Sequence, residues 1–182
     1  MKLRTIVKKI YLKAYQRIRP VSFAKAVGVN FVSGTLHLYG HVDWNTEPWL
    51  ITLGRNVYIT DGVKFLTHDG GTLLYRDQVP DLEVTKPITV GDSVYIGNNV
   101  LLLPGVTVGS DVVIGAGAVV SHDIPDHSVA VGVPARVIKS TEEYFAKLQK
   151  ESLHLGHLHG REKDLALRKY FHYTGGAMQL HE

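Results

Sequence analysis

Large aliphatic residues recur every six positions between residues 90 and 125. The first set comprises Val90, Ile96, Leu102, Val108, Ile114 and Val120, and the second, four positions later each time, comprises Val94, Val100, Val106, Val112, Ala118 and Ile124. Gly, Asn, Asp, Pro and Ser fill the intervals. A period of six fits neither an α-helix nor a free strand, but it is typical of a short strand and turn repeated as a parallel β-helix. The pattern therefore predicts a mainly β solenoid of stacked coils.

The pattern is less regular before this stretch and is interrupted immediately ahead of it. From Val21 to Tyr58 the six-residue period is uneven, and a polar and aromatic break occupies residues 43–49. The phase is lost from Leu66 to Pro87. We therefore expect residues 66–87 to leave the solenoid as a loop. Insertions in solenoids collect on one face and often build a binding site.

Helical patterns flank the predicted solenoid. An apolar stripe precedes Pro20 and comprises Leu3, Ile6, Val7, Ile10, Ala14 and Ile18. This stripe is typical of an amphipathic helix. We expect the helix to pack against the solenoid or against a neighbouring subunit; the alternative is peripheral contact of residues 1–19 with an anionic membrane. At the other end, Ser140-Thr141-Glu142-Glu143 predicts a capping box and a helix to about residue 153, with a second helix over about 161–173. We expect three parts: an N-terminal helix at 1–20, a solenoid at 21–139 and a helical extension at 140–182.

Composition and charge exclude several classes of function. The chain has 182 residues, no Cys and a formal net charge of +3. Seven basic residues and no acidic residue lie within residues 1–19, so the remainder carries +3 − 7 = −4, which argues against a nucleic-acid-binding surface. Without Cys there is no disulfide framework, cysteine zinc site or cysteine nucleophile. No apolar run approaches the roughly 20 residues of a membrane span, and no signal-peptide pattern occurs, so a cytoplasmic protein is expected.

Four blocks of sequence resemble the hexapeptide-repeat acyltransferases. They are Ile96-Gly97-Asn98-Asn99-Val100, Leu103-Pro104-Gly105-Val106-Thr107-Val108-Gly109, Ile114-Gly115-Ala116-Gly117-Ala118-Val119-Val120 and Val131-Gly132-Val133-Pro134-Ala135-Arg136-Val137-Ile138. The resemblance covers about residues 27–140. Within the family, the chain is similar to the O-acetyltransferases that act on galactosides, maltose, nodulation factors and bacterial surface polysaccharides. The resemblance implies a left-handed β-helix with three hexapeptides per turn, a homotrimer with active sites between subunits, acetyl-CoA as cosubstrate and a sugar or glycan acceptor.

The same resemblance implies roles for individual residues. Thr67-His68-Asp69-Gly70 matches the loop that carries the family's catalytic His, so His68 is the expected general base, a task that suits a neutral imidazole. Asp69 or a loop carbonyl is expected to orient the other ring nitrogen. The residues that match coenzyme A contacts are Asn98, Ala116, Ser121, Arg136 and Lys139. Backbone N–H groups, or Asn98, are candidate donors to the oxyanion. Asn45 and Tyr95 are candidate acceptor contacts, and no metal is expected.

Other functions remain open at this stage. One is an N-acyltransferase acting on an amino sugar, which would use the same His and the same CoA groove. Another is a trimeric zinc carbonic anhydrase-like enzyme with His68, His122 and His127 as ligands, although the Asp-Ile-Pro sequence between the last two fits an acetyltransferase coil better. A scaffold without catalytic activity is the third alternative.

Overall fold

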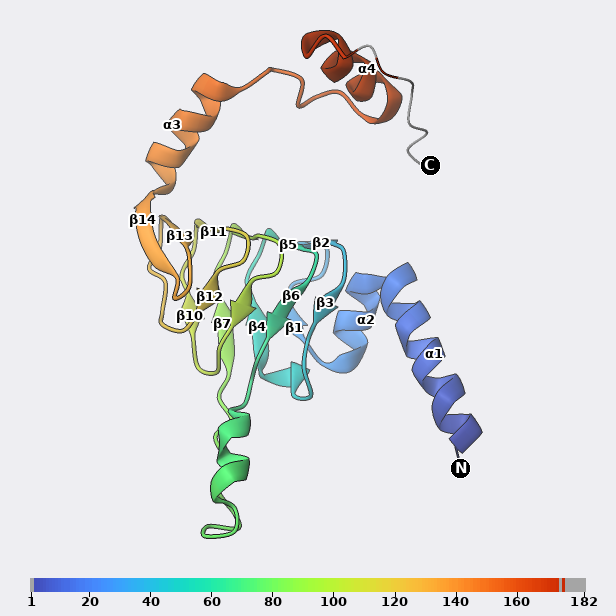
Figure 1. Cartoon of the computed structure of the whole chain (residues 1–182), viewed down its shortest axis with the longest axis vertical. Coiled ribbons are helices and arrows are strands. Elements are labelled where there is room, and N and C mark those ends of the chain that lie inside the picture. Colours follow the sequence, from blue (N-terminus) through green and yellow to red (C-terminus); the bar gives the residue numbers. More distant parts are fainter. Residues whose placement is uncertain (1, 174, 176–182) are drawn as a thin grey trace. The chain divides into compact units, whose positions relative to one another are not determined.

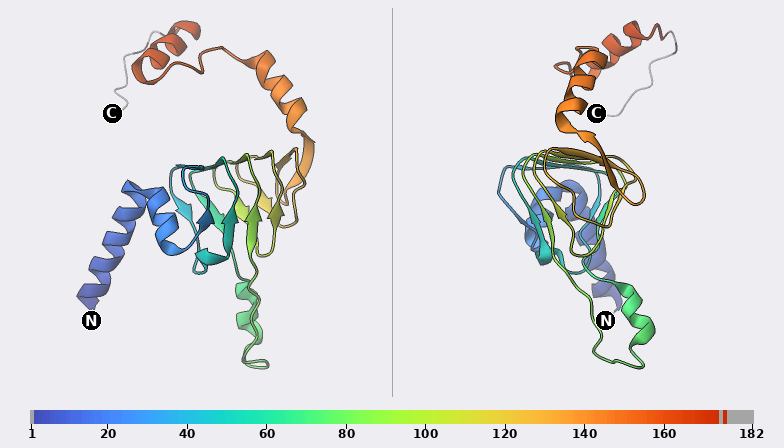
Figure 2. Two further views of the ribbon diagram at one scale, coloured as in Figure 1. Left: turned by 180° about the vertical axis from the view of Figure 1, so that it is seen from behind. Right: turned by 90° about the vertical axis from the view of Figure 1, so that its left-hand side faces the viewer.

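The structure is a computed structural model that describes residues 2–173 and 175, with side chains from residue 10 onward. Two compact units divide the chain, Met1–Tyr144 and Phe145–Glu182. The first unit contains the predicted solenoid, built from three sheets of short strands (Figures 1 and 2).

The three sheets are the faces of the solenoid. The first sheet contains β1 (Asn30–Phe31), β4 (Ile51–Leu53), β7 (Ile88–Val90) and β10 (Thr107–Val108). The second contains β2 (Leu36–Tyr39), β5 (Val57–Thr60), β8 (Val94–Ile96), β11 (Val112–Ile114), β13 (Ser128–Val131) and β14 (Arg136–Ser140). The third contains β3 (Val42–Asp43), β6 (Val63–Phe65), β9 (Leu101–Leu102) and β12 (Val119–Val120). All strand pairs are parallel except β13 with β14.

The pairing register gives the length of one turn. Thr89 pairs with Thr107, and Leu101 pairs with Val119, an offset of 18 residues in both sheets. Three hexapeptides therefore make one coil, and the predicted mainly β solenoid is confirmed. The offset between the first two coils is 21 residues in the second and third sheets, as between Val42 and Val63, and 22 in the first sheet, because the polar break at 43–49 lengthens the coil.

The core is the interior of the solenoid. Every member of both aliphatic sets is buried, with at most 5% of its surface exposed. A fully buried Val, Leu or Ile contributes about 1.5–3 kcal/mol relative to an exposed one. Close stacking also constrains the turns: a Cβ at Gly97 would lie 2.6 Å from the backbone nitrogen of Ala116. Glycine at this position therefore lets adjacent coils approach each other.

The N-terminal region differs from the prediction at Pro20. Helix α1 spans Lys2–Ile18, as expected, but a second helix, α2 (Pro20–Val27), occupies the start of the segment predicted to be solenoid. Pro is favoured at the first helical position because it lacks only an N–H that has no partner there. The first strand of the solenoid begins at Asn30, after α2.

Helix α1 is attached to the first coil mainly through one face. Gln16 donates its side-chain N–H to the carbonyl of Val42 at 2.6 Å, and Tyr15 packs edge-on against Phe23. Ile10 and Ile18, from the predicted apolar stripe, are 63% and 76% exposed. The stripe residues Leu3, Ile6 and Val7 lie outside the described side chains.

Residues 66–87 leave the solenoid, as predicted, between β6 and β7. They form the green projection in Figures 1 and 2 and include a 3₁₀-helix, η2 (Gly70–Tyr75). The two stems of this loop pair with each other: the N–H of Asp69 donates to Val84, and the N–H of Lys86 donates to Thr67, at 2.9 and 2.8 Å. The base of the loop is therefore held in a fixed backbone conformation.

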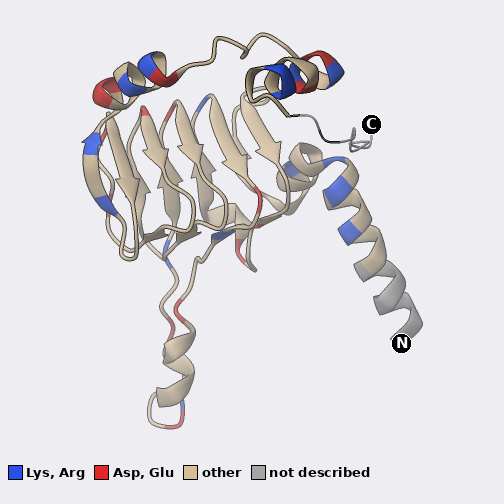
Figure 3. Ribbon diagram, turned by 45° about the horizontal axis from the view of Figure 1, so that its top comes forward, with Lys and Arg blue, Asp and Glu red and all other residues tan. Residues whose placement is uncertain are grey.

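The C-terminal helices are α3 (Thr141–Glu151) and α4 (Gly160–Tyr170). The predicted capping box is confirmed, because the N–H of Ser140 donates to the Glu143 carboxylate and the N–H of Glu143 donates to the Ser140 hydroxyl. Both helices carry charges of both signs, whereas the described part of α1 carries only basic ones (Figure 3). No helix in the described part of the chain has the length and apolar character needed to cross a membrane.

Candidate active site

The polar break at 43–49 lies next to the point where the loop leaves the solenoid. Strand β3 precedes the break and pairs with β6, which precedes the loop. Trp44 is buried and stacks on Phe65 at 5.2 Å between ring centroids. Glu47, which precedes the 3₁₀-helix η1 (Pro48–Leu50), is 21 residues before His68. Because 21 residues is also the local coil offset, these two residues are neighbours on adjacent coils.

Three side chains donate hydrogen bonds to the Glu47 carboxylate. Its Oε2 is 2.8 Å from Nδ1 of His68 and accepts from the hydroxyl of Thr67 at 2.6 Å. Its Oε1 accepts from the hydroxyl of Thr46 at 2.5 Å. These hydrogen bonds, with the charge of His68, lower the pKa of Glu47 from 4.5 to about 2, despite an opposing effect of burial. Glu47 is therefore ionised at neutral pH.

An ionised Glu47 fixes the tautomer of His68. A carboxylate can only accept a hydrogen bond, so Nδ1 of His68 carries the proton that points to it. In the neutral ring the lone pair is then on Nε2, and no hydrogen bond occupies Nε2 among the residues that the structure describes. The His68 side chain is 35% exposed, so this nitrogen is accessible to a substrate. The arrangement can remove a proton from a hydroxyl.

The backbone around His68 is also constrained. His68 forms an antiparallel bridge with Thr85 across the base of the loop, and the preceding Thr67 is fully buried. The imidazole thus lies on a paired segment, held by the Glu47 carboxylate at one ring nitrogen.

Asp69 does not contact the His68 ring, which corrects the expectation that it would orient this residue. Its carboxylate instead accepts from the N–H of Gly71 at 2.8 Å and caps η2. Asp commonly bonds to the backbone two residues later, and this local bond turns the side chain toward the loop. Sequence analysis missed Glu47. The signal available was its position one coil before His68 in a polar break.

The residues expected to bind coenzyme A lie at three places. Ser121 lies at the corner that follows the third sheet, and Thr67 and His68 lie at the same corner two coils earlier. The backbone hydrogen bonds give this count, because the N–H of Leu66 donates to Leu102 and the N–H of Leu103 donates to Val120. Two coil spacings amount to roughly 10 Å. Asn98 and Ala116 lie on adjacent coils at the corner that precedes the third sheet, and the N–H of Gly117 donates to Asn98.

Arg136 and Lys139 are both on β14, at the edge of the second sheet. Arg136 is exposed, and its guanidinium donates to the carbonyl of Ala135 at 3.0 Å. The two cations are therefore close to each other in sequence and strand, at the C-terminal end of the solenoid.

The two candidate acceptor contacts are in different surroundings. Asn45 lies in the same polar break as Glu47, and its side-chain oxygen is 3.4 Å from the hydroxyl oxygen of Thr46, which donates its proton to Glu47. Tyr95 is 43% exposed in the middle of β8, on the second sheet, and so lies on a different face of the solenoid from His68. Within one chain only Asn45 is near the Glu47–His68 pair.

The His residues considered as zinc ligands have separate neighbours. Nδ1 of His122 is 3.0 Å from the Ser121 hydroxyl, and Nδ1 of His127 is 3.4 Å from the Asp111 carboxylate. Across the described residues, no group of three or more His, Cys, Asp or Glu side chains converges on a common point.

Comparison with known proteins agrees with this architecture. Residues 87–122 match the family described as bacterial transferase hexapeptide (six repeats). Protein CapG of Staphylococcus aureus is 39% identical over 168 residues, covering 91% of this chain and 96% of that protein. The galactoside O-acetyltransferase of Escherichia coli is 38% identical over 111 residues, which cover 58% of this chain and 54% of that enzyme.

A solved structure extends the comparison to three dimensions. The maltose O-acetyltransferase of Clostridium difficile superposes with a TM-score of 0.52 and 26% identity, covering 74% of this chain and 87% of that one. Together with the near full-length match to CapG, these similarities identify an acyltransferase. The chain therefore belongs to the hexapeptide-repeat acyltransferase family, in the branch that includes the sugar O-acetyltransferases.

Proposed function

We propose that this protein is an acetyl-CoA-dependent O-acetyltransferase that moves an acetyl group to a hydroxyl of a sugar or surface-polysaccharide unit, with His68 as the general base. The observation that carries the proposal is the Glu47–His68 pair, with 2.8 Å between carboxylate and Nδ1, at the base of the loop that leaves the solenoid. The proposal includes a left-handed solenoid and a homotrimer with active sites between subunits, acting in the cytoplasm. These features are proposed from the resemblance of the repeat blocks.

The proposed reaction is a direct transfer. Nε2 of His68 takes the proton of the acceptor hydroxyl as its oxygen attacks the thioester carbonyl, and a C–O bond forms. The tetrahedral intermediate then collapses, the C–S bond breaks, and the CoA thiolate receives the proton from the imidazolium. His68 forms no covalent bond with the acyl group, so no acyl-enzyme is expected.

Glu47 is the proposed positioning residue. Its carboxylate holds the Nδ1–H tautomer before transfer and stabilises the imidazolium during it. The hydroxyls of Thr46 and Thr67 keep Glu47 anionic, because both donate to its oxygens at 2.5 and 2.6 Å. This arrangement needs no contribution from Asp69.

The residues proposed to bind acetyl-CoA fit its chemistry. Ser121, on the same corner as His68, and Asn98 and Ala116, on the preceding corner, offer polar groups for the pantetheine arm. Arg136 and Lys139 are cations suited to the phosphates. Backbone N–H groups or the Asn98 amide are the proposed donors to the developing oxyanion.

The acceptor class is proposed from the relatives. Two of them are named for acetyl transfer to galactosides and to maltose, which are sugars with free hydroxyls. Asn45, beside Glu47, is the proposed acceptor contact from this chain. Tyr95 faces another side of the solenoid, so its role as an acceptor contact depends on a neighbouring subunit.

Acetyl transfer tests the proposal. CoA release from acetyl-CoA is followed with a thiol reagent over a panel of sugars, for the wild type, His68→Ala and the control His157→Ala. We expect sugar-dependent release to fall by about 10²–10⁴-fold in His68→Ala, with CoA binding retained and His157→Ala unchanged. Equal turnover in the wild type and His68→Ala would contradict the assignment of the base.

A further inference from the structure

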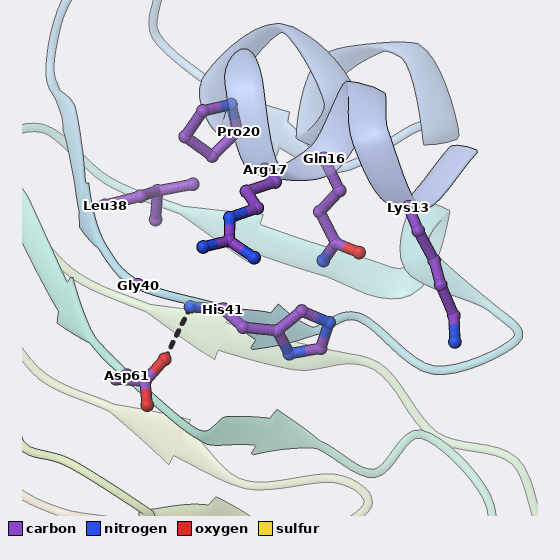
Figure 4. Close-up of a pocket in the computed structure, with 8 residues that line it drawn as sticks. All are labelled: Lys13, Gln16, Arg17, Pro20, Leu38, Gly40, His41 and Asp61. Atoms are coloured by element: carbon purple, nitrogen blue, oxygen red, sulfur yellow. Dashed lines mark hydrogen bonds between the residues drawn. The ribbon is translucent and has the colours of Figure 1, made fainter. Parts of the chain in front are cut away.

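A cavity with several charged residues in its lining lies at the end of the third sheet opposite the Glu47–His68 pair. It has a volume of about 640 Å³, is open to solvent, and is lined by α1, the start of α2, β2 and the corners that precede β3 and β6 (Figure 4). Lys13, Gln16 and Arg17 come from the helix, and His41 and Asp61 come from the two corners. None of these residues is used in the proposed acetyl transfer.

The helix presents two cations to this cavity. Lys13 and Arg17 are four residues apart in α1, so their side chains share one face; in Figure 4 the Arg17 side chain extends toward Leu38, and the Lys13 side chain lies on the other side of Gln16. Gln16 fixes this face against the solenoid through its 2.6 Å hydrogen bond to the carbonyl of Val42. The two cations are therefore held on one side of the cavity by the helix attachment.

The two corners form the other side of the cavity. The N–H of His41 donates to the Asp61 carboxylate at 2.7 Å, and the N–H of Gly62 donates to the carbonyl of His41 at 2.8 Å. This pairing leaves the His41 ring free to project toward α1, as Figure 4 shows. The paired corners therefore hold the His41 imidazole on the side of the cavity opposite Lys13 and Arg17.

The charges at the cavity are unbalanced. Lys13 and Arg17 contribute two positive charges, and Asp61 contributes one negative charge, already shared with a backbone N–H. Among the residues that the structure describes, neither Lys13 nor Arg17 forms an ion pair. Two like charges one helical turn apart are unfavourable unless an anion lies between them.

We propose that this cavity binds an anionic phosphoryl group through Arg17 and Lys13, with the His41 ring as a further hydrogen-bonding partner. A guanidinium and an ammonium from one helix face suit a group with several anionic oxygens that lies between them. Of the residues proposed to bind coenzyme A, Asn98 lies one coil beyond Asp61 at the same corner, since the N–H of Asn99 donates to the carbonyl of Asp61 at 2.9 Å, whereas Ser121 and Arg136 lie on later coils.

The position of the cavity assigns it to the acceptor side of the enzyme. Asp61 precedes β6 and His68 follows it, seven residues later, so their Cα atoms are at most about 25 Å apart. Binding a distant anionic group of the acceptor would hold its hydroxyl near Nε2. This use rests on the proposed function. A membrane lipid headgroup is the other source of the same phosphoryl chemistry.

Direct binding tests the site without acetyl transfer. Calorimetric titration with inorganic pyrophosphate is performed on the full-length wild type, Arg17→Gln, Lys13→Gln and the control Arg19→Gln, which removes a nearby cation outside the cavity. We expect saturable binding that is weakened about tenfold or more in the first two variants and is unchanged in Arg19→Gln and in His68→Ala. Equal unfolding temperatures of the variants exclude loss of the fold as the cause.

Two results would overturn the site. One is the absence of saturable pyrophosphate binding, and the other is equal weakening by Arg19→Gln, which would indicate only general attraction to a basic helix. Failure of the proposed function gives a different result from failure of the anion site. It would appear as unchanged acetyl transfer in His68→Ala, whether or not pyrophosphate binds.

A second measurement shows whether the bound phosphoryl group belongs to a lipid headgroup or to the acceptor. Competition with pyrophosphate by phosphatidylglycerol vesicles, absent with phosphatidylcholine vesicles, assigns the site to a lipid headgroup. No competition, with a raised KM for the sugar acceptor and an unchanged kcat in Arg17→Gln, assigns it to the acceptor. If vesicles do not compete and KM is unchanged, both sources are rejected and the proposal fails.

Discussion

The coils from Ile88 to Ile124 and the coils from Asn30 to Phe65 share one architecture but differ in regularity. Up to Val120 the later coils repeat every 18 residues, and their aliphatic positions are buried. The earlier coils are lengthened by the polar break at 43–49 and end at the loop 66–87. The proposed catalytic pair, Glu47 and His68, comes from these two interruptions. The regular repeats form the solenoid, and the two irregular segments provide the proposed reactive side chains.

This comparison predicts that damage to a regular coil lowers stability, whereas damage to an interruption lowers activity. The largest effect is expected from Leu102→Ala, because Leu102 is fully buried between β6 and β12. We expect a loss of about 2–5 kcal/mol in the free energy of unfolding, measured with denaturant at constant protein concentration. The specific activity of the remaining folded protein should be unchanged. A variant of normal stability and low activity would contradict the comparison.

The next effect is expected from Glu47→Gln, which keeps the size of the side chain but removes its charge. The imidazolium then lacks its anionic partner, and the amide can donate to Nδ1 as well as accept from it. We expect kcat to fall by about 10–100-fold, with KM for acetyl-CoA little changed. If kcat is unchanged and only stability is lowered, Glu47 has a structural role alone.

The pH dependence of stability gives a third prediction. The pKa of Glu47 is lowered from 4.5 to about 2 on folding, chiefly by the hydrogen bonds from Thr46 and Thr67. Its stabilising contribution is therefore complete above pH 4.5 and is lost as the pH falls toward 2. The difference in unfolding free energy between the wild type and Glu47→Gln should shrink between pH 5 and pH 2.5 or so. A constant difference over that range would contradict the shift.

The smallest effect is expected from Asp69→Ala. Asp69 caps η2 through Gly71 and does not touch the His68 ring, so the change should cost about 0.5–2 kcal/mol of stability or less. Acetyl transfer by the folded variant should stay within a few-fold of the wild type. A loss as large as that of Glu47→Gln would return the orienting role to Asp69.

The sequence predicted those parts of the fold that depend on repetition. Both aliphatic sets are buried, the loop leaves at residue 66, and the capping box at Ser140 forms as the pattern indicated. Local signals were sufficient because each coil repeats the same short strand and turn. Helix α1 ends before Pro20, as predicted, but the helix α2 that begins at Pro20 was not predicted, because Pro also favours the first position of a helix.

The site could be predicted only in part, for a different reason. His68 stands at a visible loss of phase, but its partner depends on which residue lies one coil earlier. The regular offset of 18 would point to Leu50, whereas the actual local offset of 21 brings Glu47 to His68. The length of an irregular coil cannot be read from the six-residue period. Asp69 was the nearer candidate in sequence, but its carboxylate bonds to its own loop.

The most direct test of the account is the tautomer of His68. Nitrogen NMR of the protein labelled with ¹⁵N-histidine, assigned by comparison with His68→Ala, reports which ring nitrogen carries the proton. At a pH where the ring is neutral, we predict a proton on Nδ1 and a free lone pair on Nε2 in the wild type, and a mixture of tautomers in Glu47→Gln. A wild-type ring protonated at Nε2, or a tautomer that does not change in Glu47→Gln, would contradict the claim that Glu47 prepares His68 as the base.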